Sequence, residues 1–261
     1  MPGRPYILAE TTWHAVKETT YAVAVLPWGA TEAHNHHLPY ATDTIQNDFI
    51  AAEAARIAWD QGARVIVLPT IPFGVNTGQL DVTLDINMMP STQAAVLHDV
   101  VHALATQGIP RLVVMNGHGG NNFKQMIREV GAFFPEVFIC TFNWYQILDN
   151  AGFFDEPGDH AGEMETSIMQ HVVPDLVRPL AEAGPGAARR FRVQGLRDGW
   201  AWAERAWLQV TDDTGIGNPA RATAEKGQCF LTALTGQIAG FLVDLAACDL
   251  DDLYEPEAGS G

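Results

Sequence analysis

The sequence predicts an α/β fold, a three-layer sandwich in which helices flank a mainly parallel central sheet. Four short apolar runs, rich in β-branched residues, have the composition of buried strands: residues 21–29, 63–74, 111–120 and 136–144. Segments with apolar residues at helical spacing alternate with these runs, as in parallel sheets built from strand–helix units. The runs are continuously apolar instead of alternating, which is expected when helices cover both faces of the sheet.

Four helical segments are expected between and after the strands, at residues 43–62, 91–108, 121–134 and 220–246. Gly62 and Gly108 end the first two, because glycine favours the left-handed conformation that terminates helices. Ser91 is a candidate N-cap for the second helix. There is no internal repeat or low-complexity linker, so residues 1–250 are expected to form a single domain. Residues 251–261 are acidic and are predicted to form a disordered tail.

Composition limits the partners that the chain can have. The 261 residues include 31 acidic and 15 basic ones, giving a formal net charge of −16. This argues against nucleic acid as a partner, because phosphate contacts need clustered Lys and Arg. The three cysteines fit no disulfide framework, the first residues lack the apolar stretch of a signal peptide, and no run approaches the roughly 18 apolar residues of a membrane helix. We therefore expect a soluble, cytoplasmic protein with no nucleic-acid or membrane partner.

Polar residues gather after three of the predicted strands. The segment 29–43 follows the first, Asn76 and Thr77 follow the second, and the glycine-rich turn 116–122 follows the third. Ligands of parallel α/β sheets bind beyond the carboxyl ends of the strands, so these segments are expected to meet at one edge. Asn76 and Thr77 are candidate substrate contacts there. Trp144, at the end of the fourth strand, is either a core residue or a substrate-contacting wall of the pocket.

The loop after the first strand holds the first candidate metal ligands. Glu32 and His34 lie two residues apart, and in an extended chain their side chains point the same way and can reach one point. Asp43 follows nine residues after His34, and its two carboxylate oxygens could bridge two cations; it is also a candidate helix cap. The alternative is an ordinary polar surface loop rich in histidine. His36 and His37 are expected beside the site without binding metal, with His36 as a candidate substrate contact.

Two later segments add further candidates. His118 sits between glycines that allow a tight turn and close backbone approach, and Gly119 is a candidate substrate contact. This turn is neither a dinucleotide fingerprint nor a phosphate loop. His160 is a candidate catalytic proton carrier, because imidazole titrates near neutral pH. Of the two carboxylates that follow, Glu163 is the expected metal ligand, whereas Glu165 is expected to stabilise a helix N-terminus or to support the ligands.

Three motifs, "LPWGATEAHNHHLPYATD", "NGHGGN" and "HAGEMETS", resemble in this order those of the creatininase family of metal-dependent amidohydrolases. The resemblance extends over residues 23–166. It implies an α/β fold with a parallel-type sheet, a two-metal site that usually holds zinc or manganese, and commonly a homohexamer. Carried over motif by motif, the implied metal ligands are Glu32, His34, Asp43 as the bridge, His118 and Glu163.

The chain departs from the family's name-giving enzyme in two places. The turn of that enzyme resembles N-G-H-Y-E-N, in which the Glu binds metal and the Tyr touches substrate, but this chain has Gly119 and Gly120 there. A Trp-Asp pair that precedes the catalytic histidine of that enzyme is also absent, since residues 156–159 are Glu-Pro-Gly-Asp. Creatinine is therefore not the expected substrate. The carboxylate of the second metal is expected from Glu163, as in other branches of the family.

The expected function is that of a metal-dependent amidohydrolase acting on a small molecule. It would cleave a non-peptide C–N bond, such as that of a cyclic amide or a formamide, through a metal-activated hydroxide. His160 would then deliver a proton to the leaving nitrogen. The carboxylate and imidazole ligands suit two zinc ions first, with manganese or iron as alternatives. Two other functions remain open: a peptide-trimming or deformylating member of the family, and a catalytically silent metabolite-binding subunit.

Overall fold

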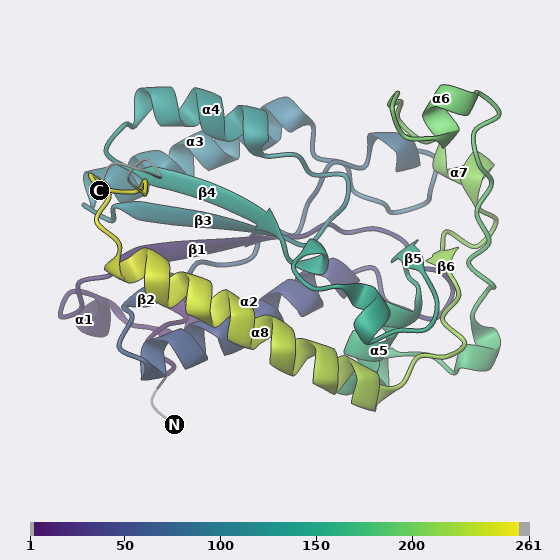
Figure 1. Cartoon of the computed structure of the whole chain (residues 1–261), viewed down its shortest axis with the longest axis horizontal. Coiled ribbons are helices and arrows are strands. Elements are labelled where there is room, and N and C mark those ends of the chain that lie inside the picture. Colours follow the sequence, from purple (N-terminus) through teal and green to yellow (C-terminus); the bar gives the residue numbers. More distant parts are fainter. Residues whose placement is uncertain (1–2, 256–261) are drawn as a thin grey trace.

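The computed structural model describes residues 3–255 and contains a four-stranded parallel sheet (Figure 1). In spatial order its strands are β2 (Val65–Val67), β1 (Val23–Trp28), β3 (Arg111–Asn116) and β4 (Phe138–Asn143), and every neighbouring pair is parallel. All four lie inside the predicted runs. β2 is much shorter than its run, because Pro69 and Pro72 lack the N–H groups that would extend its pairing.

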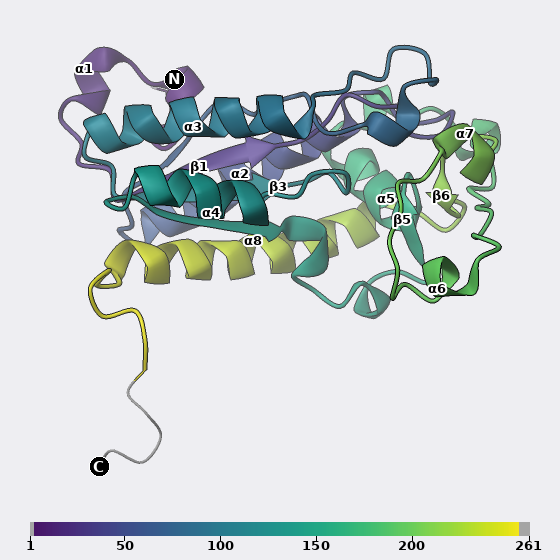
Figure 2. The ribbon, with the colours of Figure 1, turned by 90° about the horizontal axis from the view of Figure 1, so that it is seen from above.

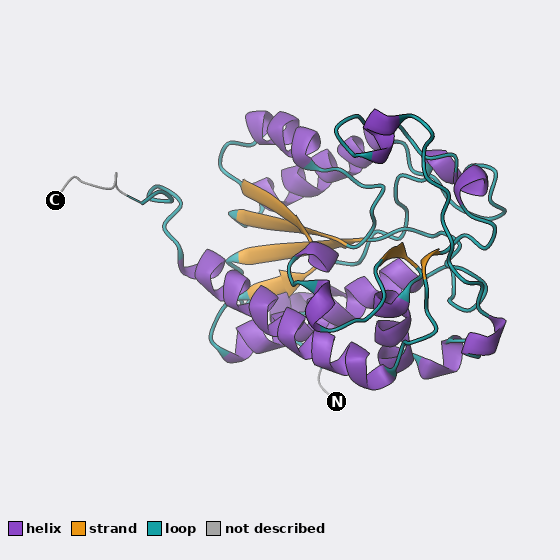
Figure 3. Cartoon of the chain, turned by 45° about the vertical axis from the view of Figure 1, so that its right-hand side comes forward, coloured by secondary structure: helices purple, strands orange, loops and turns teal. Residues whose placement is uncertain are grey.

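Helices cover both faces of this sheet, which confirms the predicted α/β fold with three layers (Figures 2 and 3). On one side lie α2 (Thr42–Asp60), α5 (Glu163–Val172) and α8 (Ala224–Ala247). On the other side lie α3 (Pro90–Thr106) and α4 (Lys124–Phe133). The strands are thus shielded from water on both faces, and this is the physical reason for their continuously apolar composition.

The two faces of β1 belong to two separate hydrophobic clusters, because successive strand residues point to opposite sides. Val25 packs in the cluster that contains Phe230 of α8, whereas Leu26 packs in the cluster that contains Leu97 of α3. Every residue of β1 is buried. The assignment of residues 1–250 to a single domain stays a prediction.

The ends of α2 and α3 show where local signals predicted helix boundaries well and where they did not. Gly62 and Gly108 follow these helices with φ values of 96° and 71°, as expected for glycines that stop a helix. The predicted N-cap at Ser91 is wrong, because α3 already begins at Pro90, with Met89 as its N-cap. Proline suits the first helical position, since its φ is fixed near the helical value and its missing N–H needs no partner there.

By length and composition alone, α8 is apolar enough to cross a membrane, although no segment of that kind was expected from the sequence. Its residues Phe230, Leu234 and Leu242 are buried against α2, α5 and the sheet. Such contacts are those of a core helix within the described chain. Beyond α8 lies the predicted acidic tail 251–261, of which residues 256–261 fall outside the described part of the structure.

The chain between α5 and α8 lies beyond the carboxyl ends of the strands (Figure 1). It contains α6 (Gln194–Arg197), α7 (Trp207–Val210) and β6 (Ile216–Gly217). β6 pairs antiparallel with β5 (Gly158–His160) in a small second sheet. α1 (Trp13–Val16) lies at the opposite end of the molecule. The segment with α6 and α7 therefore covers the edge at which the sequence places its polar residues.

Candidate metal centre

Four separate parts of the chain bring buried carboxylates and imidazoles together at the carboxyl edge of the sheet. Glu32 and His34 come from the loop after β1, Asp43 from the first turn of α2, and His118 from the glycine-rich turn after β3. The fifth member is Glu165 of α5. Potential ligand atoms lie within 4.8 Å of one another in two groups. One group contains Glu32, Asp43 and His118, and the other contains His34, Asp43 and Glu165.

Asp43 belongs to both groups. Its Oδ1 lies 3.0 Å from His34 Nε2, and its Oδ2 lies 3.2 Å from His118 Nδ1. Glu32 Oε1 is 2.8 Å from His118 Nδ1, and Glu165 Oε1 is 3.7 Å from His34 Nε2. A single carboxylate thus faces two imidazoles with two different oxygens, which is what a ligand shared by two cations must do.

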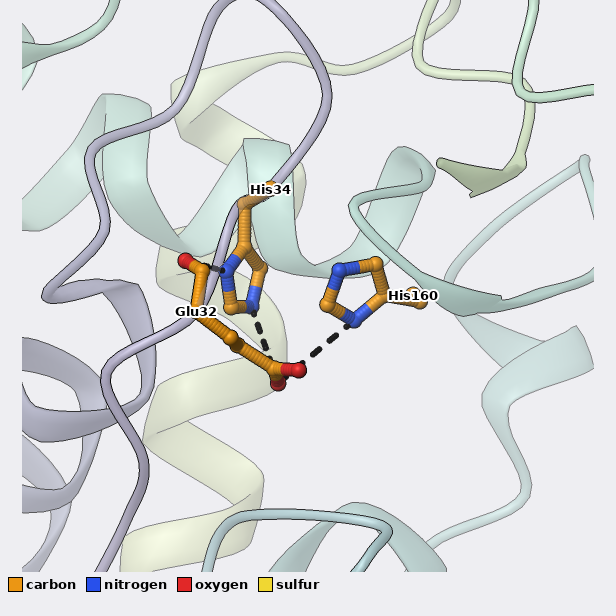
Figure 4. A group of neighbouring side chains, drawn as sticks. All are labelled: Glu32, His34 and His160. Carbon is orange, nitrogen blue, oxygen red and sulfur yellow. Dashed lines mark hydrogen bonds and ion pairs between the residues drawn. The ribbon is translucent and has the colours of Figure 1, made fainter. Parts of the chain in front are cut away.

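His160 lies beside this cluster, at the end of β5 (Figure 4). Its ring centroid is 4.1 Å from that of His34, and its Nδ1 is 3.8 Å from Glu32 Oε1. These three residues form a third group of potential ligand atoms. The ring of His160 also packs nearly perpendicular to that of Trp207, with a centroid distance of 5.3 Å. Its neighbours therefore fix the orientation of the His160 ring next to the cluster.

The backbone determines which nitrogen of each imidazole carries a hydrogen. Each ring places one nitrogen against a backbone carbonyl oxygen: His34 Nδ1 at 3.1 Å from Glu32 O, His118 Nε2 at 3.0 Å from Val75 O, and His160 Nε2 at 2.8 Å from Ala33 O. A carbonyl oxygen can only accept, so this ring nitrogen is the donor. In the neutral ring the other nitrogen then carries a lone pair. In all three rings that second nitrogen faces carboxylate oxygens.

The lone pair of a ring nitrogen and a carboxylate oxygen repel each other unless a positive charge lies between them. His34 Nε2 and Asp43 Oδ2 are buried without a hydrogen-bond partner among the described residues, although buried polar atoms are nearly always paired. A cation bound between the rings and the carboxylates would satisfy both atoms. Metal-binding histidines usually donate their other N–H to a carbonyl or carboxylate, as these rings do. Oxygen and imidazole donors without cysteine thus fit a pair of divalent cations.

The charges within the cluster also favour a bound cation. Burial opposes ionisation of Glu32, but the neighbouring imidazoles, His118 foremost, hold the pKa of this carboxyl well below its usual range. Burial also disfavours charged imidazoles, yet Asp43 raises the pKa of His34 well above its usual value. Glu32 has the same effect on the pKa of His118. The carboxylates therefore create a strongly negative field that favours bound cations, whether protons or metal ions.

Glu163 does not reach the cluster, which corrects its predicted place there; Glu165 occupies that place instead. Glu163 Oε2 accepts hydrogen bonds from the backbone N–H groups of Asp155 at 2.9 Å and Glu156 at 2.7 Å, and Oε1 forms an ion pair with Lys226 of α8. Residues two apart on a helix point about 200° apart, so only one of these carboxylates can face the cluster. The packing of α5 against α8 turns Glu163 toward Lys226 and leaves Glu165 facing the imidazoles.

Hydrogen bonds and close packing fix the turn that carries His118. Asn116 Nδ2 donates to the carbonyl oxygen of His118 at 2.8 Å, and Asn121 Nδ2 donates to Asn116 Oδ1 at 2.9 Å. A Cβ atom at Gly120 would lie 2.1 Å from the Val75 carbonyl oxygen, which is the acceptor for His118. Glycine at this position therefore permits the contact that orients the His118 ring.

A cavity of about 680 Å³ opens over the cluster and is lined by Glu32, His118 and His160 among others. Two of the predicted substrate contacts, Asn76 and Gly119, also line this cavity. A Cβ atom at Gly119 would meet open space, so the backbone there is accessible from the cavity. The catalytic candidate His160, the ligand candidates Glu32 and His118, and these two contacts therefore share one cavity, which we call the catalytic cavity.

Three predicted substrate contacts lie elsewhere. Thr77 Oγ1 donates to Glu204 Oε2 at 3.1 Å, and Thr77 is not among the residues that line the catalytic cavity. Trp144 is buried, and its Nε1 donates to Asn47 Oδ1 at 3.0 Å, so it takes the core role that the sequence left open. His36 is exposed and does not line the cavity, because the chain turns outward after His34.

Two residues outside the motifs also support the site. Gln79 Nε2 donates to Glu32 Oε2 at 2.5 Å, and Trp207 contacts His160 as described above. Neither belongs to a recognisable sequence pattern, so only the folded chain reveals their roles.

His37, expected beside the ligands, is buried, and burial lowers its pKa to about 4. It is therefore neutral near physiological pH.

A family model described as creatinine amidohydrolase matches residues 9–242, a range that includes every member of the cluster. The chain belongs to the creatininase family. It is 28% identical over 204 residues to the creatinine amidohydrolase of Pseudomonas putida, covering 67% of this chain and 75% of that protein. It is 29% identical over 220 residues to the mycofactocin precursor peptide peptidase of Mycobacterium tuberculosis, covering 80% of each protein. The creatininase family is therefore hydrolytic, but its members act on different substrates.

Solved structures of creatininase-family proteins share this fold. A protein from Bacteroides fragilis NCTC 9343, provisionally described as a creatinine amidohydrolase, has a TM-score of 0.90 and 43% identity, with 96% of this chain and 99% of that one covered. Creatininase structures of a zinc–zinc type and a manganese type have TM-scores of 0.76 and 0.74, at 22% and 21% identity. Each of these covers 93% of this chain and 99% of its own. At 22% and 21% identity, the likeness to these two structures establishes the creatininase fold.

Proposed function

We propose that this creatininase-family hydrolase cleaves a C–N bond other than a peptide bond in a small molecule, such as a cyclic amide or a formamide. Two divalent cations, zinc first and manganese or iron as alternatives, would be held by Glu32, His34, Asp43, His118 and Glu165. The observation that carries the proposal is the set of three imidazoles, each bonded through one nitrogen to a backbone carbonyl and facing carboxylates through the other. The backbone thereby presets the donor atoms of the site.

When bound, the cations would acidify water near neutral pH and polarise a substrate carbonyl. The chain's own contribution is to orient the substrate and to move a proton. His160 keeps its Nε2–H on the Ala33 carbonyl oxygen, so its Nδ1 is the atom that faces Glu32 in the catalytic cavity. Nδ1 can take up a proton there and release it to the leaving nitrogen. Packing against Trp207 would restrict rotation of this ring.

The glycine-rich turn supports a substrate other than creatinine. A glutamate at Gly120, as in the name-giving enzyme, would bring its Cβ to 2.1 Å from the Val75 carbonyl oxygen. The backbone of this chain would have to move before it could supply a ligand from that position. At Gly119, where that enzyme has a tyrosine, the open space leaves room for a different or larger substrate.

A peptide-trimming or deformylating activity is the second candidate. It is favoured by the similarity to a mycofactocin precursor peptide peptidase, which extends over 80% of both chains. A catalytically silent metabolite-binding subunit is disfavoured, because five potential ligands, with Glu165 in place of Glu163, come together beside His160. The activities differ in their substrates and therefore can be separated by assay.

We also propose that the protein is cytoplasmic and assembles as a homohexamer. The family resemblance supports the hexamer, and so does the loop between β2 and α3, which exposes Phe73, Leu80, Leu84, Ile86 and Met89 in the isolated chain. Apolar surface gathered in one loop is typical of a protein interface. Size-exclusion chromatography with light scattering tests the assembly, and a monomeric mass at micromolar concentration would contradict it.

Metal analysis combined with a substrate panel tests the proposed activity. We expect about one to two transition-metal ions per purified chain, and hydrolysis of at least one cyclic amide, formamide, urea or guanidine. His118→Ala should lose both metal and activity. His14→Ala is the matched control, because His14 is an exposed residue of α1 at the opposite end of the molecule, and it should keep both. Metal well below one ion per chain, or full activity of His118→Ala, would contradict the proposal, and hydrolysis of peptides alone would favour the second candidate.

A further inference from the structure

A second cavity, of about 1270 Å³, adjoins the catalytic cavity and is lined by five arginines: Arg189, Arg190, Arg192, Arg197 and Arg205. We call it the arginine cavity. The chain has only 15 Lys and Arg residues and a net charge of −16, so a third of its basic residues line this one cavity. Three carboxylates, those of Glu156, Asp159 and Glu204, line the same cavity, so arginines outnumber acidic side chains there by five to three.

Three of these arginines have no acidic partner. Within the described residues, no carboxylate oxygen lies within 4.0 Å of the guanidinium groups of Arg190, Arg192 or Arg197, and all three side chains belong to exposed residues. Arg189 pairs with Asp212, at 2.6 and 2.8 Å, and Arg205 pairs with Asp159 at 3.0 Å. Exposed guanidinium groups that line one cavity without a carboxylate partner have donors free to bind an anion.

The arginine cavity lies next to the catalytic cavity. Asp159, Glu204 and Arg205 line both. The Arg205 guanidinium lies 4.7 Å from the ring centroid of Trp207, and that ring contacts His160. Figure 1 shows α6 and α7 on the same side of the molecule as β5, the strand that ends at His160. The contacts from Arg205 through Trp207 to His160 therefore place this end of the arginine cavity beside the proposed proton carrier.

Guanidinium groups select for a particular ligand chemistry. Their planar donors match the oxygens of carboxylates and phosphates and bind them in pairs. A net charge of −16 repels a free anion at long range, and a local cluster of positive charge offsets this and raises the anion's local concentration. Neither effect would help to bind a neutral molecule.

We propose that the arginine cavity binds an anionic group, a carboxylate or a phosphate, on the molecule whose C–N bond is cleaved in the catalytic cavity. This inference rests on the proposed function for the cleavage, but the anion site itself stands on the arginines alone. Arg190, Arg192 and Arg197 would then select the substrate by its anionic group. This group would lie some distance from the C–N bond that is cleaved.

Calorimetric titration of the metal-loaded protein tests this proposal with inorganic phosphate, succinate and the neutral analogue succinamide as probes. We expect at least one of the two anions to bind, and succinamide to bind more weakly than succinate; which anion binds more tightly distinguishes a phosphate from a carboxylate site. Arg190→Gln/Arg192→Gln should weaken anion binding at least about tenfold. Lys17→Gln/Arg128→Gln removes two positive charges elsewhere and should change it by less than about twofold.

Binding to the metal centre must be separated from binding to the arginines. The anion titration is therefore repeated with His118→Ala, in which binding should persist. Loss of binding in His118→Ala together with unchanged binding in Arg190→Gln/Arg192→Gln would overturn the proposal. Equal weakening by the two charge-removing double variants would also overturn it. If the purified protein lacked metal but the arginine variant still lost anion binding, the hydrolase would be refuted while the anion site would stand.

Discussion

Glu163→Ala is expected to destabilise the protein without removing its metal. The carboxylate of Glu163 is buried and accepts from two backbone N–H groups, those of Asp155 and Glu156, and from the ammonium group of Lys226. A hydrogen bond to a buried charged group contributes about 1.5–3 kcal/mol, and Glu163 accepts two from the backbone, whereas Lys226 is exposed enough for its ion pair to add little. We therefore expect a loss of about 3 kcal/mol in the free energy of unfolding, or about 6–12 °C in Tm.

Glu165→Gln should show the opposite pattern. It removes a candidate ligand that faces His34, so metal affinity should fall by at least about 100-fold. Metal content is measured on the purified variants, and Tm is measured by circular dichroism in EDTA, so that bound metal does not contribute. In EDTA, the Tm of Glu165→Gln should fall less than that of Glu163→Ala. Glu163→Gln is the control, because its amide oxygen still accepts from the two N–H groups and should preserve part of the stability.

The two variants together test how α5 is oriented. If Glu163→Ala lost its metal while Glu165→Gln kept it, the assignment of the two carboxylates would be refuted. A Tm of Glu163→Ala within about 2 °C of the wild type would show that the hydrogen bonds from Asp155 and Glu156 contribute little, and the estimate of about 3 kcal/mol would be wrong.

Removal of metal by EDTA should lower Tm by about 5–10 °C relative to protein kept at a free metal concentration near 100 times Kd, where metal binding stabilises the fold by about 2.7 kcal/mol. An unchanged Tm would contradict a bound metal. Gly120→Ala should lower metal affinity, because its Cβ would lie 2.1 Å from the Val75 carbonyl oxygen, whereas Gly119→Ala meets open space and should retain metal. Equal metal contents in these two variants would count against that reasoning. Trp207→Leu should lower kcat about tenfold at unchanged metal content, because it frees the ring of His160. A change confined to KM would show that Trp207 acts only as a wall of the cavity.

The fold was predictable because its signal is local. Parallel strands covered by helices on both faces must be apolar at every position, and β1 shows this in a run of six buried residues. The candidate ligands Glu32, His34 and His118 were predictable for a related reason. They follow strands whose carboxyl ends meet at one edge, so the order of elements already brings them together.

The roles of other residues could be assigned only from the packing of segments that are far apart in the sequence. Glu163 and Glu165 follow the same glycine and are both acidic, and the sequence favoured the wrong one. Which of them faces the imidazoles depends on the contact of α5 with α8, far along the chain. Trp144 shows the same limitation, because a large aromatic residue at a strand end suits a cavity wall as well as a core. Here it is buried in the core.

The sequence by itself determined the α/β fold, the creatininase family and the segments that carry the candidate ligands. Helical periodicity, apolar runs and short motifs are properties of neighbouring residues, and they survive without knowledge of long-range contacts. Only the tertiary structure decided that Glu165 completes the cluster, that Trp207 holds His160, and that arginines between residues 189 and 205 stand beside the catalytic cavity. These features arise where segments far apart in the chain pack together, and side-chain direction there is set by the packing.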